Sequence, residues 1–480
     1  MRHVKKLAFA AGACGLAAVT AASSATLTSA AAVSAAGAPS SASASSASAL
    51  ADVAVHPDVL HLKSAETSSP LTLAQCESLY HVACYDPAQI EQAYNLPGLY
   101  AKGINGKGTT IVIVDSFGSP TIKHDLSVFD STYGLPAPPS FSIITPVGSM
   151  PKWNASDSDM TGWGGETTLD VEYAHTIAPG AKILLVETPV SETEGTHGFP
   201  QIVAAEEYVM KHYHPDVISQ SFSATEQTFK NFASVQGLRG ANLMAEKDKV
   251  TVLAASGDSG AADVGLDGST YYLFPVTSWS DSDPLVTAVG GTELHLDAAG
   301  DHTSPDTAWN DTWNKYVNLS SQPNPDAGGG GKSIFFSRPW YQNGVAAEVG
   351  DHRGVPDIAM SGSGSGAVYT YQSFPGAGPG WQPTWGTSEA TPLFAGIVAL
   401  ASQYAGHSLG LINPALYEMS AKGMPGIVPV TSGNNTVTFI QGGKQHTVRG
   451  WNARAGYSLA AGVGTVDGLY FVPELAKLAG

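Results

Sequence analysis

The stretch Trp385-Gly-Thr-Ser-Glu-Ala-Thr-Pro392 places a serine at the start of a predicted helix. Residues 393–400, which follow, are all small or apolar, so we expect this helix to be buried. Pro392 is compatible with the first turn of such a helix. Free backbone N–H groups and the positive end of the helix dipole favour negative charge at this point. Ser388 is therefore a candidate nucleophile, although the same pattern also fits an ordinary serine N-cap.

Two acids lie four positions apart in residues 164–175, Gly-Gly-Glu-Thr-Thr-Leu-Asp-Val-Glu-Tyr-Ala-His. If this segment is helical, Glu166 and Asp170 share one face, and their repulsion raises the pKa of at least one of them. A carboxyl group with a raised pKa suits acid–base chemistry below neutral pH. The alternative is a solvated acidic face, but the segment is largely apolar and the chain has few basic residues to neutralise exposed acids.

A third acid, Asp258, lies in Ala254-Ala-Ser-Gly-Asp-Ser-Gly260, directly after an apolar segment that predicts a strand. An aspartate between glycine and serine can simply form a turn. At the carboxyl end of a buried strand, however, the same side chain projects into the region where α/β proteins bind ligands. The motif alone does not decide between the two interpretations.

Four continuous apolar segments alternate with helical patterns and predict buried parallel strands. They span residues 109–115, 182–187, 217–221 and 250–255, and residues 201–211 predict one of the intervening helices. We therefore expect an α/β fold with a doubly wound, mostly parallel sheet that is covered by helices on both faces.

A glycine run, Gly328–Gly331, followed by Lys332 and Ser333, has some similarity to a phosphate-binding loop. No apolar strand precedes the run and no helical pattern follows it. A flexible loop is therefore the preferred interpretation.

Composition limits the possible partners. The chain has 480 residues and 43% hydrophobic content, enough for a large core. Lys and Arg total 23 against 41 Asp and Glu, so the net charge is -18, which argues against nucleic acid or an anionic membrane as partner.

The amino terminus has the pattern of a secretory signal: basic residues, an apolar run over about residues 7–19, and then small residues. We assign 1–36 to this signal, 37–84 to a linker or short pro-segment, and 85–480 to the globular domain. Two nearby cysteines in an exported protein favour a Cys76–Cys84 disulfide. The protein is therefore expected to be secreted and extracellular.

From about Tyr85 to its end the chain resembles the sedolisins, the serine-carboxyl peptidases that share the subtilisin fold. Besides the three acidic and serine motifs above, the resemblance rests on Phe274-Pro-Val-Thr-Ser-Trp279, Val286-Thr-Ala-Val-Gly-Gly-Thr292 and Arg353-Gly-Val-Pro-Asp357. The resemblance implies a hydrolase that cleaves the peptide bonds of other proteins or peptides and works in acid, and we expect it to be a monomer.

The resemblance also implies roles for individual residues. They are Ser388 as nucleophile, Glu166 as general base, Asp170 as the acid that orients Glu166 and shares its proton, and Asp258 as the oxyanion-hole residue. Asp115 and Phe222 match positions that extend or shield the acid network in the family. These roles are chemically consistent. A carboxylate that acts as a general base must be ionised, whereas a carboxyl group that donates a hydrogen bond to an oxyanion must be protonated.

Two alternatives stay open at this stage. An ordinary subtilisin-type peptidase would use Asp115, His197 and Ser388, but His197 follows the Ala178-Pro-Gly-Ala-Lys-Ile segment, whereas the base of a subtilisin precedes it. A secreted, inactive homologue used for binding would have a damaged site, whereas all four implied positions are intact.

The family resemblance further implies a calcium ion near the carboxyl terminus, bound by two Asp side chains and several carbonyls. This chain has Pro429-Val-Thr431 and Gly456-Tyr-Ser458 at the matching positions. Pro429 and Ser458 replace the two carboxylates that would provide most of the affinity for Ca²⁺. We expect no cofactor and a calcium site that is weak or empty.

Overall fold

The computed structural model of the chain describes residues 60–61 and 67–479, which belong to one compact unit. The predicted signal segment 1–36 and residues 37–59 lie outside the described residues, so the signal and pro-segment assignments stay predictions. Within the described ranges, no helix is both long and apolar enough to cross a lipid bilayer.

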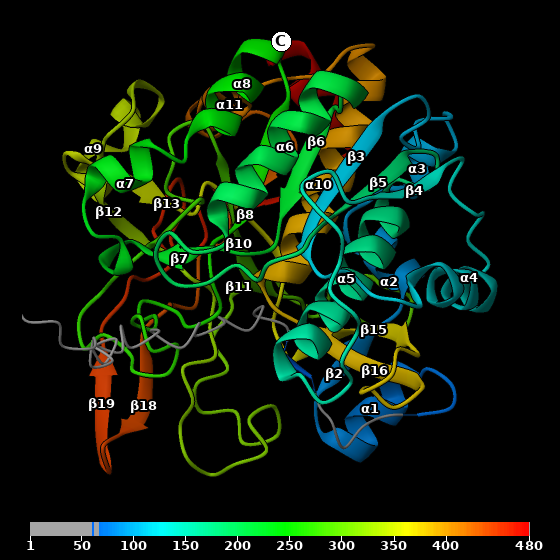
Figure 1. Ribbon diagram of the computed structural model, residues 1–480, viewed down its shortest axis with the longest axis horizontal. Helices are drawn as coiled ribbons and strands as arrows, with labels where there is room; N and C mark the ends of the chain where they lie inside the picture. Colours follow the sequence, from blue (N-terminus) through cyan, green and yellow to red (C-terminus); the bar gives the residue numbers. More distant parts are fainter. Residues whose placement is uncertain (1–59, 62–66, 480) are drawn as a thin grey trace, which may run out of the picture. The chain divides into compact units, whose positions relative to one another are not determined.

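An eight-stranded sheet forms the centre of this unit (Figure 1). Seven strands run parallel, in the order β4 (Phe141–Ile144), β5 (Lys182–Thr188), β3 (Thr110–Ser116), β6 (Val217–Gln220), β8 (Thr251–Ala255), β10 (Thr287–Glu293) and β14 (Ile358–Ser361). The short β11 (Thr307–Ala308) pairs antiparallel with β10. The four predicted strands are confirmed to within one residue at each end.

Helices cover both faces of the sheet because β3 is apolar on both of its sides. Ile111 and Ile113 belong to one hydrophobic core, together with residues of α4 (Ile122–Tyr133), α5 (Ser158–Ile177), α10 (Thr387–Ala405) and α12 (Gly468–Leu478). Val112 and Val114 belong to a second core, together with residues of α6 (Phe199–Tyr213) and α8 (Gly240–Asp248). The predicted α/β class, with helices on both sides of a mostly parallel sheet, is confirmed.

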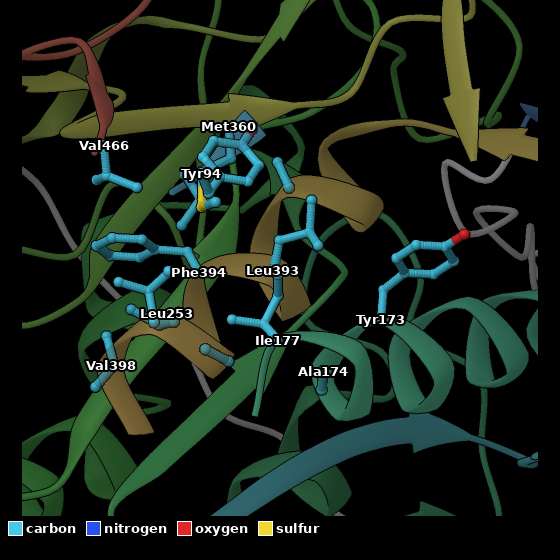
Figure 2. Packing of buried hydrophobic residues seen from close by; sticks show 14 of the residues in the cluster. Tyr94, Tyr173, Ala174, Ile177, Leu253, Met360, Leu393, Phe394, Val398 and Val466 are labelled. Atoms are coloured by element: carbon cyan, nitrogen blue, oxygen red, sulfur yellow. The ribbon is translucent and has the colours of Figure 1, made fainter. Parts of the chain in front are cut away.

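The two longest helices, α5 and α10, pack directly against each other in the first core. Figure 2 shows Ala174 and Ile177 of α5 beside Leu393, Phe394 and Val398 of α10. A helix that is apolar on nearly all sides, such as α10, is stable only in a core. The close approach depends on a glycine, because a Cβ at position 396 would lie 2.5 Å from the Cβ of Ile177.

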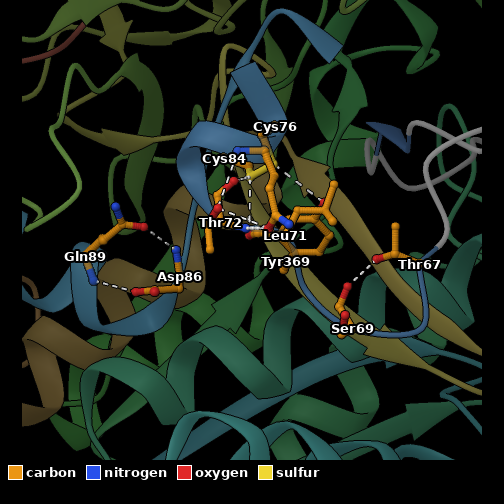
Figure 3. The surroundings of a disulfide bond; sticks show 10 residues. Thr67, Ser69, Leu71, Thr72, Cys76, Cys84, Asp86, Gln89 and Tyr369 are labelled. Atoms are coloured by element: carbon orange, nitrogen blue, oxygen red, sulfur yellow. Dashed lines mark hydrogen bonds between the residues drawn. A yellow bond between two sulfur atoms is a disulfide. The ribbon is translucent and has the colours of Figure 1, made fainter. Parts of the chain in front are cut away.

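A smaller sheet positions the strand that leads into α10. Its order is β1 (Leu60–His61), β16 (Gly380–Trp385), β15 (Gly366–Gln372) and β2 (Ala83–Tyr85). Helix α1 (Leu73–Tyr80) precedes β2, and the structure joins the two through a Cys76–Cys84 disulfide (Figure 3). Residues 67–84 therefore pack onto the same unit as the predicted domain 85–480.

The remaining elements lie between these strands or after α10 and are mostly short. They are α2 (Pro87–Ala93), α3 (Pro97–Tyr100), β7 (Ala224–Thr225), η1 (Glu226–Thr228), α7 (Phe232–Gln236), β9 (Ser278–Trp279), β12 (Gly331–Ser337), η2 (Trp340–Val345), α9 (Ala346–Val349), β13 (His352–Val355), α11 (Asn413–Lys422), β17 (Ile427–Val428), β18 (Val437–Gln441), β19 (Lys444–Val448) and β20 (Thr465–Val466).

The α5–α10 contact predicts the effect of one substitution. Gly396→Ala gains about 1 kcal/mol of helix propensity, but it overpacks the contact with Ile177, which costs about 1–3 kcal/mol. Because the collision involves two Cβ atoms, we expect the cost to exceed the gain and the free energy of unfolding to fall by up to about 2 kcal/mol. Urea titration measures this change. Gly344→Ala, where a new Cβ meets nothing within 4 Å, is the matched control, and equal stability of the two variants would contradict the prediction.

Candidate active site

The structure brings the four predicted site residues and Asp115 together in one buried cluster. They lie in β3 (Asp115), in the middle of α5 (Glu166 and Asp170), in the loop after β8 (Asp258) and at the second residue of α10 (Ser388). Asp258 is 4% exposed, and the other four have no exposed surface. Parallel strands end at one edge of the sheet, and the α5–α10 contact brings the remaining positions to that edge.

Burial raises the pKa of Glu166 well above its ordinary value, and the nearby charges of Asp170 and Asp115 raise it further. The nearby Ser388 hydroxyl partly offsets this rise in the pKa of Glu166. The contact is loose, because neither Glu166 oxygen nor Ser388 Oγ has a partner of good hydrogen-bond geometry among the described residues. Loose contacts of this kind are common in unliganded active sites and tighten when substrate binds.

Asp170 and Asp115 form the inner part of the cluster. Burial and the charge of Asp115 raise the pKa of Asp170, while a hydrogen bond from Ser221 Oγ to Asp170 Oδ1 (2.8 Å) lowers it. Burial raises the pKa of Asp115 to about 7, although the Thr167 side chain opposes this rise. The three acids therefore titrate as a coupled group, in which few can be ionised at the same time.

Two of these supporting residues were missed by the sequence interpretation. Ser221 lies just beyond the end of β6, and Thr167 lies between Glu166 and Asp170 on α5. Ser221 could have been identified from its hydroxyl side chain at the end of a predicted strand. Phe222 was singled out, and it packs edge-on against Trp163 of α5. The Phe222 ring has no group that could donate a hydrogen bond to the acids.

Ser388 is not an N-cap, which removes the ordinary alternative for this residue. Gly386 is the N-cap of α10 and Ser388 is its second helical residue. The expectation that Pro392 lies in the first turn is wrong, since Pro392 is the sixth residue of the helix. A proline there lacks the N–H that would bond to the carbonyl four residues earlier. That carbonyl belongs to Ser388, so the helix is locally loosened at the candidate nucleophile.

Asp258 is bound to the start of the same helix. Its Oδ1 accepts hydrogen bonds from Thr387 N (2.7 Å) and Thr387 Oγ1 (2.6 Å). Gly257 N donates to Thr387 Oγ1 at 3.2 Å. Thr387 thus connects the loop after β8 with the turn that carries Ser388, a role that was not visible in the sequence because the partners are 129 positions apart.

The glycine run packs against the same loop and is not a phosphate cradle. Gly329 N donates to Gly257 O at 2.6 Å, and Ser256 Oγ donates to Gly329 O at 2.9 Å. A Cβ on Gly329 would collide with the backbone of Ser256. The run is therefore a close backbone contact next to Asp258 rather than the flexible loop expected from the sequence.

His197 does not belong to the cluster. It lies in the loop before α6 and is exposed, whereas Ser388 and Asp115 are fully buried. Its carbonyl accepts a hydrogen bond from Thr193 Oγ1. The arrangement therefore offers no support for an Asp115, His197 and Ser388 triad.

Comparisons with known proteins agree with this geometry. Residues 154–459 match the Subtilase family. Kumamolisin from Bacillus sp. (strain MN-32) is 30% identical over 406 residues, which cover 82% of this chain and 64% of kumamolisin. The chain belongs to the sedolisin family. Another relative is tripeptidyl-peptidase sed4 from Aspergillus fumigatus, 29% identical over 402 residues that cover 72% of this chain and 59% of sed4. This sedolisin-family chain thus spans less than two thirds of either relative.

A solved structure supports the same assignment. Pseudomonas sedolisin, a serine-carboxyl proteinase in complex with two molecules of pseudo-iodotyrostatin, superposes with a TM-score of 0.65 and 25% sequence identity. The superposition covers 83% of this chain and 99% of that one. The subtilisin-like fold predicted from the family resemblance is therefore confirmed.

The calcium site that the family resemblance implies finds few suitable oxygen donors in this chain. Pro429 offers no side-chain oxygen, and the Ser458 hydroxyl already accepts a hydrogen bond from Ala461 N at 3.1 Å. Asp467 is engaged with Asn95 Nδ2 at 2.9 Å. Within the described residues, no group of three or more His, Cys, Asp or Glu side chains could hold a metal ion. These donors do not fit a tight calcium site.

An asparagine amide joins the carboxyl-terminal loops of this region. Asn435 Nδ2 donates to Gly330 O (3.3 Å) and Leu459 O (3.4 Å), and Asn435 Oδ1 accepts from Trp451 N (2.8 Å). The side chain is fully buried. Because one amide contacts three separate loops, hydrogen bonding and packing can hold this region without a cation.

We therefore predict that calcium has little effect on stability. The melting temperature should be nearly equal in excess chelator and in millimolar calcium, because a weakly bound ion adds little ligand-linked stabilisation. Differential scanning calorimetry in the two buffers checks this. A drop of about 10 °C or more on chelation would exceed what a few kcal/mol give a domain of this size and would show that other oxygens form a tight site.

Proposed function

We propose that the protein is a secreted serine-carboxyl peptidase that hydrolyses peptide bonds of proteins or peptides in acid. One observation carries the proposal: the Ser388 hydroxyl, at the start of a buried helix, contacts the carboxyl group of a Glu166/Asp170 pair. Secretion rests on the predicted signal segment 1–36. The related kumamolisin and tripeptidyl-peptidase sed4 support the reaction class.

The chemistry proceeds through an acyl-enzyme. Ionised Glu166 takes the hydroxyl proton of Ser388 as Oγ bonds to the substrate carbonyl carbon. The carbonyl oxygen becomes an oxyanion near the start of α10, where the protonated Asp258 donates a hydrogen bond to it. Glu166 then returns the proton to the leaving amine as the C–N bond breaks. Water repeats the cycle on the ester, which releases the acid and regenerates Ser388.

The charge state of the cluster sets the working pH. Glu166 and Asp170 must hold one negative charge between them, because a second charge in the same buried volume is strongly unfavourable. Asp258 must be protonated, yet its two hydrogen bonds from Thr387 favour the ionised form. Acid therefore keeps Asp258 able to donate while the carboxyl pair still provides one base.

Substrate entry involves the edge of β16. The structure pairs β1 antiparallel with this strand, with Leu60 opposite Trp385, three positions before Ser388. The edge can thus accept an extended chain through backbone hydrogen bonds, which is a common way to bind peptides. Because β1 already occupies the edge, a substrate that uses it must displace β1.

The first functional prediction concerns the nucleophile. Ser388→Ala should reduce hydrolysis of a denatured protein at acidic pH by several orders of magnitude, because no acyl-enzyme can form. Mass spectrometry of the digest measures the rate and shows whether cuts are internal or release tripeptides. Ser402→Ala, at another buried serine of the same helix, is the matched control and should keep near-normal activity. Substantial turnover by Ser388→Ala would refute the assignment.

The second functional prediction concerns pH. The wild-type protein should have an acidic optimum and little activity at neutral pH, because ionised Asp258 repels the oxyanion. Asp258→Asn donates a hydrogen bond at every pH, so it should flatten the alkaline limb even if it lowers the maximum rate. Profiles of kcat/KM from pH 2 to 8 for the wild type and for Asp258→Asn check the two expectations. A wild-type maximum near pH 8, together with an inactive His197→Ala variant, would instead indicate a histidine base.

A further inference from the structure

Thr387 lies directly before Ser388 and binds Asp258, the acid that the proposed mechanism uses as oxyanion donor. It is the first residue of α10 and is fully buried. Its backbone N–H and its hydroxyl both donate to the same carboxyl oxygen, Asp258 Oδ1, at 2.7 Å and 2.6 Å. Two donors on one oxygen of an acid restrict where that acid can hold its own proton.

A third contact fixes the direction of the Thr387 hydroxyl group. Gly257 N donates to Thr387 Oγ1 at 3.2 Å, so Oγ1 is the acceptor in that bond. The single hydroxyl hydrogen is then left for Asp258. The peptide group of Gly257 is held in turn, because Gly329 N donates to Gly257 O at 2.6 Å. The backbone of the loop after β8 thus orients the hydroxyl that binds Asp258.

These contacts leave one place for the proton of neutral Asp258. A protonated carboxyl group has one hydroxyl oxygen and one carbonyl oxygen, and the carbonyl oxygen can accept two hydrogen bonds. Asp258 Oδ1 already receives two hydrogens, one of them from a backbone N–H, which can only donate. Oδ1 is therefore the carbonyl oxygen of the neutral acid, and Oδ2 carries the proton.

We propose that Thr387 is a positioning residue that keeps the proton of Asp258 on Oδ2, from which it is donated to the oxyanion. The same bonds have a second consequence, because donors to a carboxyl group favour its ionised form. Thr387 therefore fixes the place of the proton and also moves the alkaline limit of activity to lower pH. The statements about activity rest on the proposed peptidase function, whereas the bond itself is testable without it.

The first arm of the test measures stability, which does not depend on activity. In a Ser388→Ala background, Thr387→Val removes the hydroxyl and keeps a β-branched side chain. The unfolding constants with Thr387 and with Thr387→Val are compared in urea from pH 3 to 8, once with Asp258 and once with Asp258→Asn. The hydroxyl bond favours ionised Asp258, so its full contribution to stability is present at high pH. Part of that contribution is lost as pH falls and Asp258 takes up its proton.

With Asp258 present, we expect Thr387→Val to raise the unfolding constant by a factor that is about tenfold larger at pH 8 than at pH 3, which corresponds to a pKa change of about one unit. With Asp258→Asn, residue 258 does not titrate, so the factor should be constant within about twofold. A factor that does not change with pH in the presence of Asp258, or that changes equally in both backgrounds, would overturn the proposal.

The second arm measures kcat and KM against pH. Thr387→Val should lower kcat at the acidic optimum by about threefold to tenfold, less than the loss of a whole oxyanion donor. KM should change little, because the oxyanion forms only during the reaction. The alkaline limb should move upward by about one pH unit. Thr387→Ser keeps the hydroxyl and should stay close to the wild type in both respects. A Thr387→Val limb at the wild-type position, or an equal displacement in Thr387→Ser, would overturn the role in activity.

Two comparisons separate this role from the loss of any buried hydroxyl. In an Asp258→Asn background, Thr387→Val should leave the pH profile unchanged, because residue 258 cannot ionise. Thr176→Val is the matched control, since it removes another fully buried hydroxyl, on α5, which donates to Glu172 O at 2.9 Å. It should keep the wild-type limb, and an upward displacement in either comparison would overturn the proposal.

The two arms also distinguish this inference from the proposed function on which it rests. If the wild type has no peptidase activity at any pH, the proposed function fails. The stability arm still decides whether the Thr387 hydroxyl binds the Asp258 carboxyl group.

Discussion

The arrangement of this molecule depends on one electrostatic constraint: several carboxyl groups are buried together, and within the described part of the chain no positive charge offsets theirs. At an effective dielectric constant of about 20, two charges 4 Å apart repel by about 4 kcal/mol, which corresponds to about three pKa units. Glu166, Asp170 and Asp115 therefore cannot all be ionised together. The cluster therefore titrates as one coupled site, and in the proposed mechanism its protonation sets the pH range in which a base is available.

Because the acids of the cluster repel one another when ionised, other interactions must hold them together. The apolar contact of α5 with α10 supplies them, since a buried Leu, Ile or Phe side chain contributes about 1.5–3 kcal/mol. Figure 2 shows several of these side chains on both helices. Gly396 lets the two backbones come close enough for Glu166 and Ser388 to meet. Apolar packing on one part of each helix thus offsets the cost of burying acids on another.

Much of the fold and of the candidate site could be predicted from the sequence. The remaining features could not be predicted, and the reasons are physical. Periodicity and the four-residue spacing of Glu166 and Asp170 are local signals, so they predicted the strands and the shared helix face. The Thr387–Asp258 bond and the Gly329 contact join distant segments, which no local pattern reports.

The buried acids of this site also make the stability of the fold depend on pH. Glu166 and Asp170 each have a folded-state pKa above the ordinary value, so each contributes its full stability below the pKa of the unfolded chain. That contribution is lost as pH rises toward the folded pKa, because the unfolded chain releases protons that the folded chain retains. A histidine-based site would place no such demand on its scaffold. The stability that these acids contribute is therefore greatest in acid, the range in which the proposed mechanism works.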